Sequence, residues 1–120
     1  MSNSTKFKFL PHTADIKFQA FGKNLNEVFE NSALALFNSM YKGKIKAKKK
    51  FNIKVKGNDL ESLMYNFLEE FLYLFDAKGF IGSKVKVKIN KIKNILSAEV
   101  FGDDTKNYDI AKEYYLIALS

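Results

Sequence analysis

The chain has 120 residues and no cysteine, which excludes disulfide bonds, thiolate metal sites and cysteine nucleophiles together. Its length predicts one domain over residues 1–120. The net charge of +7 comes from 20 basic residues, all of them lysine, against 13 acidic ones. Because only arginine offers a rigid fork for bidentate contacts, this composition argues against sequence-specific reading of bases. No apolar run approaches the roughly 20 residues that span a bilayer, and the first residues do not form a signal peptide, so we expect a cytoplasmic protein without a membrane partner.

The charge is unevenly distributed along the chain. Residues 42–57 hold eight lysines and no acid, residues 80–93 hold five lysines and no acid, and residues 58–79 sum to −4. In the two basic segments lysine alternates with apolar residues, which is the period-two pattern of a strand with one face in water. The simpler interpretation is a solvated lysine face on a half-buried sheet. The alternative is a surface that attracts RNA or an acidic partner at long range.

The first predicted elements are two short strands. Residues 7–10 and 16–22 have an extended pattern, and Pro11 interrupts it because proline lacks a donor N–H. His12 and Asp15 therefore fall in a turn between the two strands.

Two helices are predicted from apolar residues spaced 3.6 residues apart. The first covers about residues 25–40, and Asn24 and Glu27 before it have the spacing of a capping box. The second covers about residues 58–77 and ends before Gly79, a natural C-cap residue.

The remaining predicted elements are strands at residues 51–57, 80–90, 95–101 and 110–119, with a hairpin turn at 91–94. The order is strand, helix, strand, helix and then strands, and the short connection makes at least part of the sheet antiparallel. The sequence therefore predicts an α+β fold, in which two helices pack on one face of a mostly antiparallel or mixed β-sheet.

The common catalytic motifs are absent from the sequence. Its six glycines are scattered and form neither GxGxxG nor GxxxxGK, which excludes the usual nucleotide-binding loops. A serine hydrolase triad would need the single histidine, His12, as its base, and the sequence has no serine in a GxSxG motif. A hydrolase triad is therefore poorly supported.

Two aspartates remain as candidate ligands. Asp15 follows His12 in the first turn, and Asp59 lies at the start of the second helix. Each has a structural interpretation, because Asp15 and His12 can hydrogen-bond within the turn and Asp59 can cap the helix. The alternative is that Asp15 and Asp59 come together and hold a hard divalent cation through oxygen ligands, although two carboxylates alone make a weak site.

Several stretches of the sequence resemble the archease family. The resemblance covers about residues 7–80, and its most specific parts are the HTAD turn and the DLESL helix start. The matching stretches are residues 10–16 (LPHTADI), 20–25 (AFGKNL), 28–37 (VFENSALALF), 59–64 (DLESLM) and 68–76 (LEEFLYLFD).

The resemblance implies an archease-like fold and an accessory protein that is not an enzyme. Archeases assist the RtcB-type RNA ligase in tRNA splicing by promoting its guanylation and turnover, so that ligase is the implied partner, with tRNA or a tRNA-modifying enzyme as an indirect one. The family binds a divalent cation, usually taken as calcium. The matching positions are Asp15 and Asp59, with His12 as a support of the turn. The alternative function is a lysine-faced module that binds RNA or an RNA-modifying enzyme.

The C-terminal part departs from the family pattern. Family members usually continue through a Lys-Ala-x-Thr-Tyr-His strand and a last strand ending in an aspartate of the metal site. Residues 110–115 match the first only loosely, and the terminal aspartate has no counterpart in this sequence. Two interpretations stay open: the C-terminal part is naturally shortened, or the chain is a reduced variant in which cation binding is weakened or lost. Asp103, Asp104 and Asp109 are candidate substitutes, but the sequence does not place them near Asp15.

Overall fold

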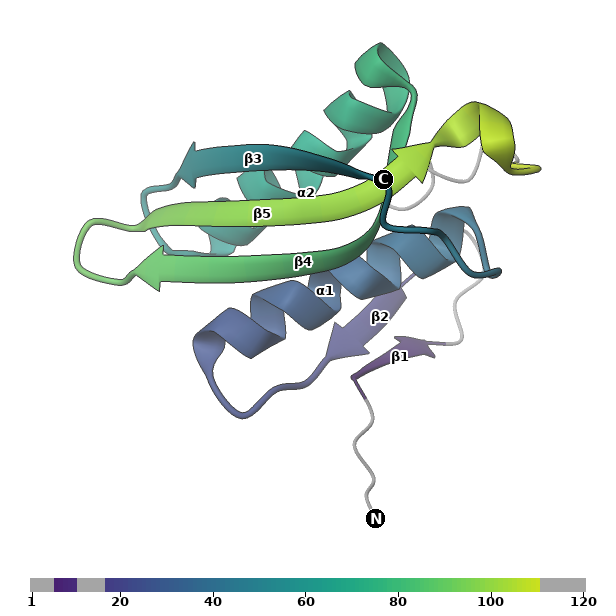
Figure 1. The fold of residues 1–120 in the computed structure, drawn as a ribbon. Helices are drawn as coiled ribbons and strands as arrows, with labels where there is room; N and C mark the ends of the chain where they lie inside the picture. The colour runs from purple at the N-terminus through teal and green to yellow at the C-terminus, as the bar shows by residue number, and fades with distance from the viewer. Residues whose placement is uncertain (1–5, 11–16, 111–120) are drawn as a thin grey trace.

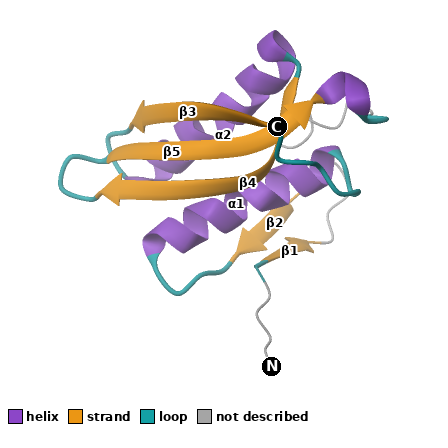
Figure 2. Cartoon of the chain, in the orientation of Figure 1, coloured by secondary structure: helices purple, strands orange, loops and turns teal. Residues whose placement is uncertain are grey.

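The computed structural model describes residues 6–10 and 17–110. None of the helices in this part is long and apolar enough to cross a membrane. Figures 1 and 2 show the elements, which follow one another in this order: β1 (Phe7–Leu10), β2 (Lys17–Ala20), α1 (Leu25–Met40), β3 (Lys49–Lys56), α2 (Leu60–Lys78), β4 (Phe80–Asn90), β5 (Ile95–Asp104) and the 3₁₀ helix η1 (Thr105–Asn107).

The main sheet has the strand order β3-β5-β4, and both of its pairings are antiparallel. Both helices lie behind this sheet in Figure 1, so they cover the same face. The predicted α+β fold, with two helices on one face of a sheet, is confirmed. The predicted turn at residues 91–94 is confirmed as well, because it joins β4 and β5.

The first two strands form a separate two-stranded antiparallel sheet that lies against α1 (Figure 1). No parallel pairing occurs in the described residues, so the mixed alternative is not realised there. Side chains of α1 occupy part of the outer edge of β4: Glu30 accepts the N–H of Val87, and Asn26 accepts that of Ile89. These contacts leave that stretch of edge unavailable to a further strand.

The core lies between the helices and the sheet and is rich in phenylalanine. The Phe37 ring on α1 meets the Phe71 ring on α2 edge-on, with centroids 4.9 Å apart, and Phe67 packs against Phe71 in the same way at 4.8 Å. Gly82 on β4 lies under Phe37, and a Cβ atom there would fall 2.4 Å from its Cζ atom. The absence of a side chain at Gly82 therefore allows α1 to approach the sheet.

The helix ends follow the sequence signals with one difference. The Asn24 side chain accepts the N–H of Glu27 at 2.9 Å, as predicted for an N-cap. The Glu27 carboxylate, however, accepts the N–H of Lys23 at 3.0 Å, so the reciprocal half of the predicted capping box is not formed with Asn24. Gly79 ends α2 with φ of 59°, which confirms the predicted C-cap.

Several strand boundaries differ from the prediction. β2 ends at Ala20 rather than at residue 22, and β3 covers Lys49–Lys56 rather than residues 51–57. β5 continues to Asp104 rather than ending at residue 101, because Phe80 and Ile81 pair with Asp104 and Asp103. This pairing overrides the weak strand propensity of glycine and aspartate. The predicted strand at 110–119 lies almost wholly in residues 111–120, outside the described part of the chain.

Candidate functional site

The structure describes one of the three residues predicted for the site. Asp59 lies in the connection between β3 and α2, whereas His12 and Asp15 belong to residues 11–16, outside the described residues. The approach of Asp15 to Asp59 therefore stays a prediction.

Asp59 is the N-cap of α2. Its Oδ1 atom accepts the backbone N–H of Ser62 at 2.8 Å, and the Ser62 hydroxyl oxygen accepts the backbone N–H of Asp59 at 3.1 Å. These reciprocal bonds form a capping box and confirm the structural interpretation of Asp59. Hydrogen bonds from the backbone and the side chain of Ser62 lower the pKa of the Asp59 carboxyl below its usual value of 3.8. Asp59 is therefore an exposed carboxylate that stays negative at neutral pH.

The start of α2 is fixed against the turn between β4 and β5. The N–H of Gly57 donates to the carbonyl oxygen of Asn94 at 3.0 Å, and the Asn94 side-chain amide donates to the carbonyl oxygen of Asn58 at 3.1 Å. A Cβ atom at Gly57 would lie 2.5 Å from the backbone nitrogen of Leu63, so the chain passes close to the helix there. These contacts hold the Asp59 carboxylate at a defined position at this end of the sheet.

Asp103 is a buried carboxylate at the other end of β5 and is 3% exposed. Its carboxylate accepts three hydrogen bonds: from the Tyr108 hydroxyl at 2.8 Å, from the N–H of Asp104 at 2.8 Å and from the side-chain amide of Asn107 at 3.2 Å. Burial alone would raise the pKa of the Asp103 carboxyl, but these three hydrogen bonds and the positive charge of Lys48 lower it overall. Both carboxylate oxygens are engaged, so Asp103 holds η1 in place.

Tyr108 joins this end of β5 to the loop before β3. Its hydroxyl oxygen accepts the N–H of Lys46 at 3.0 Å, and its ring lies 5.3 Å from that of Tyr41. The Lys46 N–H lowers the pKa of the Tyr108 phenol, but burial and the negative charge of Asp103 outweigh it and raise the pKa overall. Residues 46 and 108 are far apart in sequence, so no local signal could have revealed this contact.

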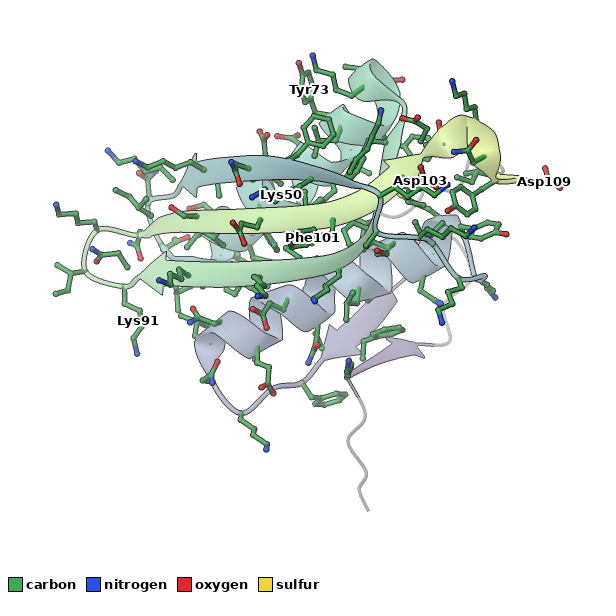
Figure 3. The ribbon with its side chains drawn as sticks, in the orientation of Figure 1. Lys50, Tyr73, Lys91, Phe101, Asp103 and Asp109 are labelled. Carbon is green, nitrogen blue, oxygen red and sulfur yellow. The ribbon has the colours of Figure 1, made fainter. Side chains whose placement is uncertain are left out.

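The other two acids considered as substitute ligands, Asp104 and Asp109, do not share a site with Asp103. Asp104 pairs with the Lys49 ammonium at 2.6 Å, and Asp109 is exposed beyond η1 (Figure 3). Within the described residues, no three histidine or acidic side chains come together as a metal site. These residues do not by themselves fit calcium, which takes six to eight oxygen ligands.

The predicted alternation of exposed lysines and buried apolar residues on the sheet is confirmed. On β3, Lys54 and Lys56 are exposed, whereas the neighbouring Ile53 is buried on the side of the helices. On β4, Lys86 is exposed and the next residue, Val87, is buried. The lysines therefore cover the face of the sheet opposite the helices.

Comparisons with a family profile, with known sequences and with solved structures all point to one family. Residues 7–113 match the profile of the Archease protein family (MTH1598/TM1083). The "Protein archease" of Pyrococcus furiosus is 46% identical over 95 residues, which are 77% of this chain and 67% of the relative. That of Sulfurisphaera tokodaii is 39% identical over 99 residues, 82% of this chain and 71% of the relative. The solution structure of Methanobacterium thermoautotrophicum protein 1598 superposes with a TM-score of 0.75 at 34% identity, over 88% of this chain and 77% of that one.

Proposed function

Because this chain belongs to the archease family, we propose that it is a non-enzymatic activator of an RtcB-type RNA ligase in tRNA splicing. It would promote guanylation of the ligase and repeated turnover. The family match over residues 7–113 carries this proposal, since it includes both the HTAD turn and the DLESL helix start.

The arrangement of the described residues supports a role in positioning. Asp59 presents a charged carboxylate from a rigid helix start, and an exposed charge fixed in this way can orient a partner group.

The activity is tested by adding the protein to an RtcB-type ligase with GTP and following the guanylated ligase and the ligated RNA. We expect faster guanylation and many turnovers per ligase at stoichiometric amounts. Asp15→Ala should abolish this effect, whereas Glu61→Gln, which removes one exposed acid from the first turn of α2, should retain it. Unchanged guanylation with the wild-type protein would contradict the proposal.

Cation binding is a separate part of the proposal. We propose that Asp15 and Asp59 contribute carboxylate ligands to a divalent cation, with calcium as the first ion to test. Bound calcium would supply a local positive charge, and the activation described above is not routed through it. Calorimetric titration should show calcium binding that Asp15→Asn and Asp59→Asn each weaken, while Glu61→Gln leaves it unchanged. Equal binding by all four proteins would rule out these ligands without touching the proposal on ligase activation.

A further inference from the structure

The open face of the main sheet carries a dense array of lysines. Six point away from the helices. Two acids share the outward positions of the three strands: Glu99, and Asp103 near the end of β5, whose carboxylate is buried and hydrogen-bonded to Asn107 and Tyr108. The six are Lys50, Lys54 and Lys56 on β3 and Lys84, Lys86 and Lys88 on β4. This face is turned toward the viewer in Figure 3, with both helices behind it.

The lysines form two rows with a lower floor between them. Successive outward residues of one strand are about 6.8 Å apart, and β5 separates the two rows by about 10 Å. The floor carries shorter side chains, because Ser97 on β5 lies between Lys54 and Lys88 in the pairing register. A hollow of about 720 Å³ lies over this region; its lining includes these three residues, Lys86, and two acids, Glu99 on β5 and Glu30 on α1.

One aromatic ring completes the floor. Phe101 on β5 is half-buried and pairs with Lys50 on one side and Lys84 on the other. The Lys84 Nζ atom lies 5.7 Å from the centroid of the Phe101 ring, close enough for a cation–π contact. The Lys50 ammonium is 3.4 Å from the Glu99 carboxylate, and both side chains are about half exposed, so this pair is weakly held.

We propose that this face, defined by the six lysines and Phe101, binds single-stranded RNA. The lysine rows would contact phosphates on both sides of the floor, and the Phe101 ring would stack on an unpaired base. Lysine is a mobile point charge, so the contacts would be independent of sequence.

The composition of the face favours RNA over an acidic protein. The centres of protein–protein interfaces are depleted of lysine and enriched in aromatic residues and arginine, whereas this face has six lysines, one ring and no arginine. Nucleic-acid interfaces are more polar and much more positive. A ring exposed on a strand also suits a single strand better than a duplex, in which the bases are already stacked.

The test is fluorescence anisotropy of a labelled single-stranded RNA of mixed sequence with the protein alone, so its outcome is independent of the proposed ligase role. A strand that contacts about four lysines gives a log–log salt slope of about −3, so a fourfold rise in salt should weaken binding roughly 60-fold. The variant K54Q/K86Q/K88Q should bind at least about tenfold more weakly, with a slope shallower by about 2. The matched control K23Q/K78Q/K106Q removes three exposed lysines outside the face and should bind as the wild type does.

A second variant separates stacking from charge. Phe101→Leu should lose about fivefold or more in affinity at every salt concentration, with an unchanged salt slope. Thermal unfolding of each variant is the check that the fold is retained. Four outcomes would each overturn the proposal. The two triple-lysine variants could lose affinity equally, or the protein could bind duplex RNA as tightly as the single strand. Polyglutamate could displace the RNA at equal concentration, or the protein could fail to bind RNA at low salt.

Discussion

The Glu30 carboxylate of α1 accepts the backbone N–H of Val87, an outer-edge residue of β4, with Oε2 2.8 Å from the nitrogen. The next N–H along the same edge, that of Ile89, donates to the Asn26 side chain at 3.2 Å. An unpaired strand edge offers N–H groups to any other strand. The helix α1 therefore packs on the sheet and also accepts hydrogen bonds from two backbone N–H groups at its edge.

We predict that Glu30→Ala lowers the free energy of unfolding by about 1–3 kcal/mol, because it leaves the partly buried N–H of Val87 without its acceptor. Glu30→Gln should cost less, since the amide oxygen can still accept. Denaturant unfolding measures the change, and hydrogen exchange at the Val87 amide should speed up in the alanine variant. Glu69→Ala, at an exposed position of α2, is the control. A Glu30→Ala protein as stable as this control would show that the bond contributes nothing.

For Asp59 we predict that alanine lowers the melting temperature by several degrees, because the first turn of α2 loses its cap. Asparagine also caps well, so Asp59→Asn should melt close to the wild type. This contrast makes Asp59→Asn the informative variant for cation binding, since it removes the charge and keeps the cap. Equal melting of the alanine variant and the wild type would contradict the capping role.

The lowered pKa of the Asp59 carboxyl also predicts part of the pH dependence of the free energy of unfolding. The pKa of the Asp59 carboxyl is lower in the folded chain than its usual value of 3.8, so the folded state favours the charged form. Its contribution is fully present above 3.8 and is lost as the pH falls through the folded pKa. Acid titration of the melting temperature should therefore show a smaller decrease for Asp59→Asn than for the wild type. An identical acid profile would mean that Asp59 titrates alike in both states.

For Tyr108 we predict that phenylalanine destabilises the loop before β3 and raises the pKa of the Asp103 carboxyl. The variant keeps the ring beside Tyr41 but loses the hydroxyl that donates to Asp103 and accepts from Lys46. With a higher Asp103 pKa, stability should be lost at a higher pH on acidification. NMR titration of the Asp103 carboxyl carbon measures the shift directly. An unchanged pKa would show that the other donors suffice.

The helices and the main strands could be predicted because their signals are local. The apolar spacing gave both helices, and the lysine alternation gave β3 and β4 with the correct face in water. Asn24, Asp59 and Gly79 marked helix ends through chemistry that acts within one turn.

The rest depends on contacts between distant residues. The separation of β1 and β2 from the main sheet has no local signal, and neither does the use of Glu30 at the edge of β4. The sequence offers Asp103 as a candidate cation ligand, but in the fold its carboxylate accepts hydrogen bonds from Asn107 and Tyr108. Only folding brings Lys46 to the same tyrosine. The approach of Asp15 to Asp59 stays a prediction, because nothing local joins the two segments and residue 15 lies outside the described part of the chain.

The contact between Gly82 and Phe37 gives the last prediction. A Cβ atom at Gly82 would overlap the Phe37 ring, which is 5% exposed and held edge-on against Phe71. The ring cannot move aside freely, so Gly82→Ala should destabilise the fold by about 1–3 kcal/mol. Phe37→Leu alone should also destabilise, because it leaves a cavity. The double variant should lose less than the sum of the two single losses, since the smaller side chain makes room for the new methyl group. Denaturant unfolding of all four proteins measures this coupling, and simple additivity would mean that α1 shifts as a whole instead.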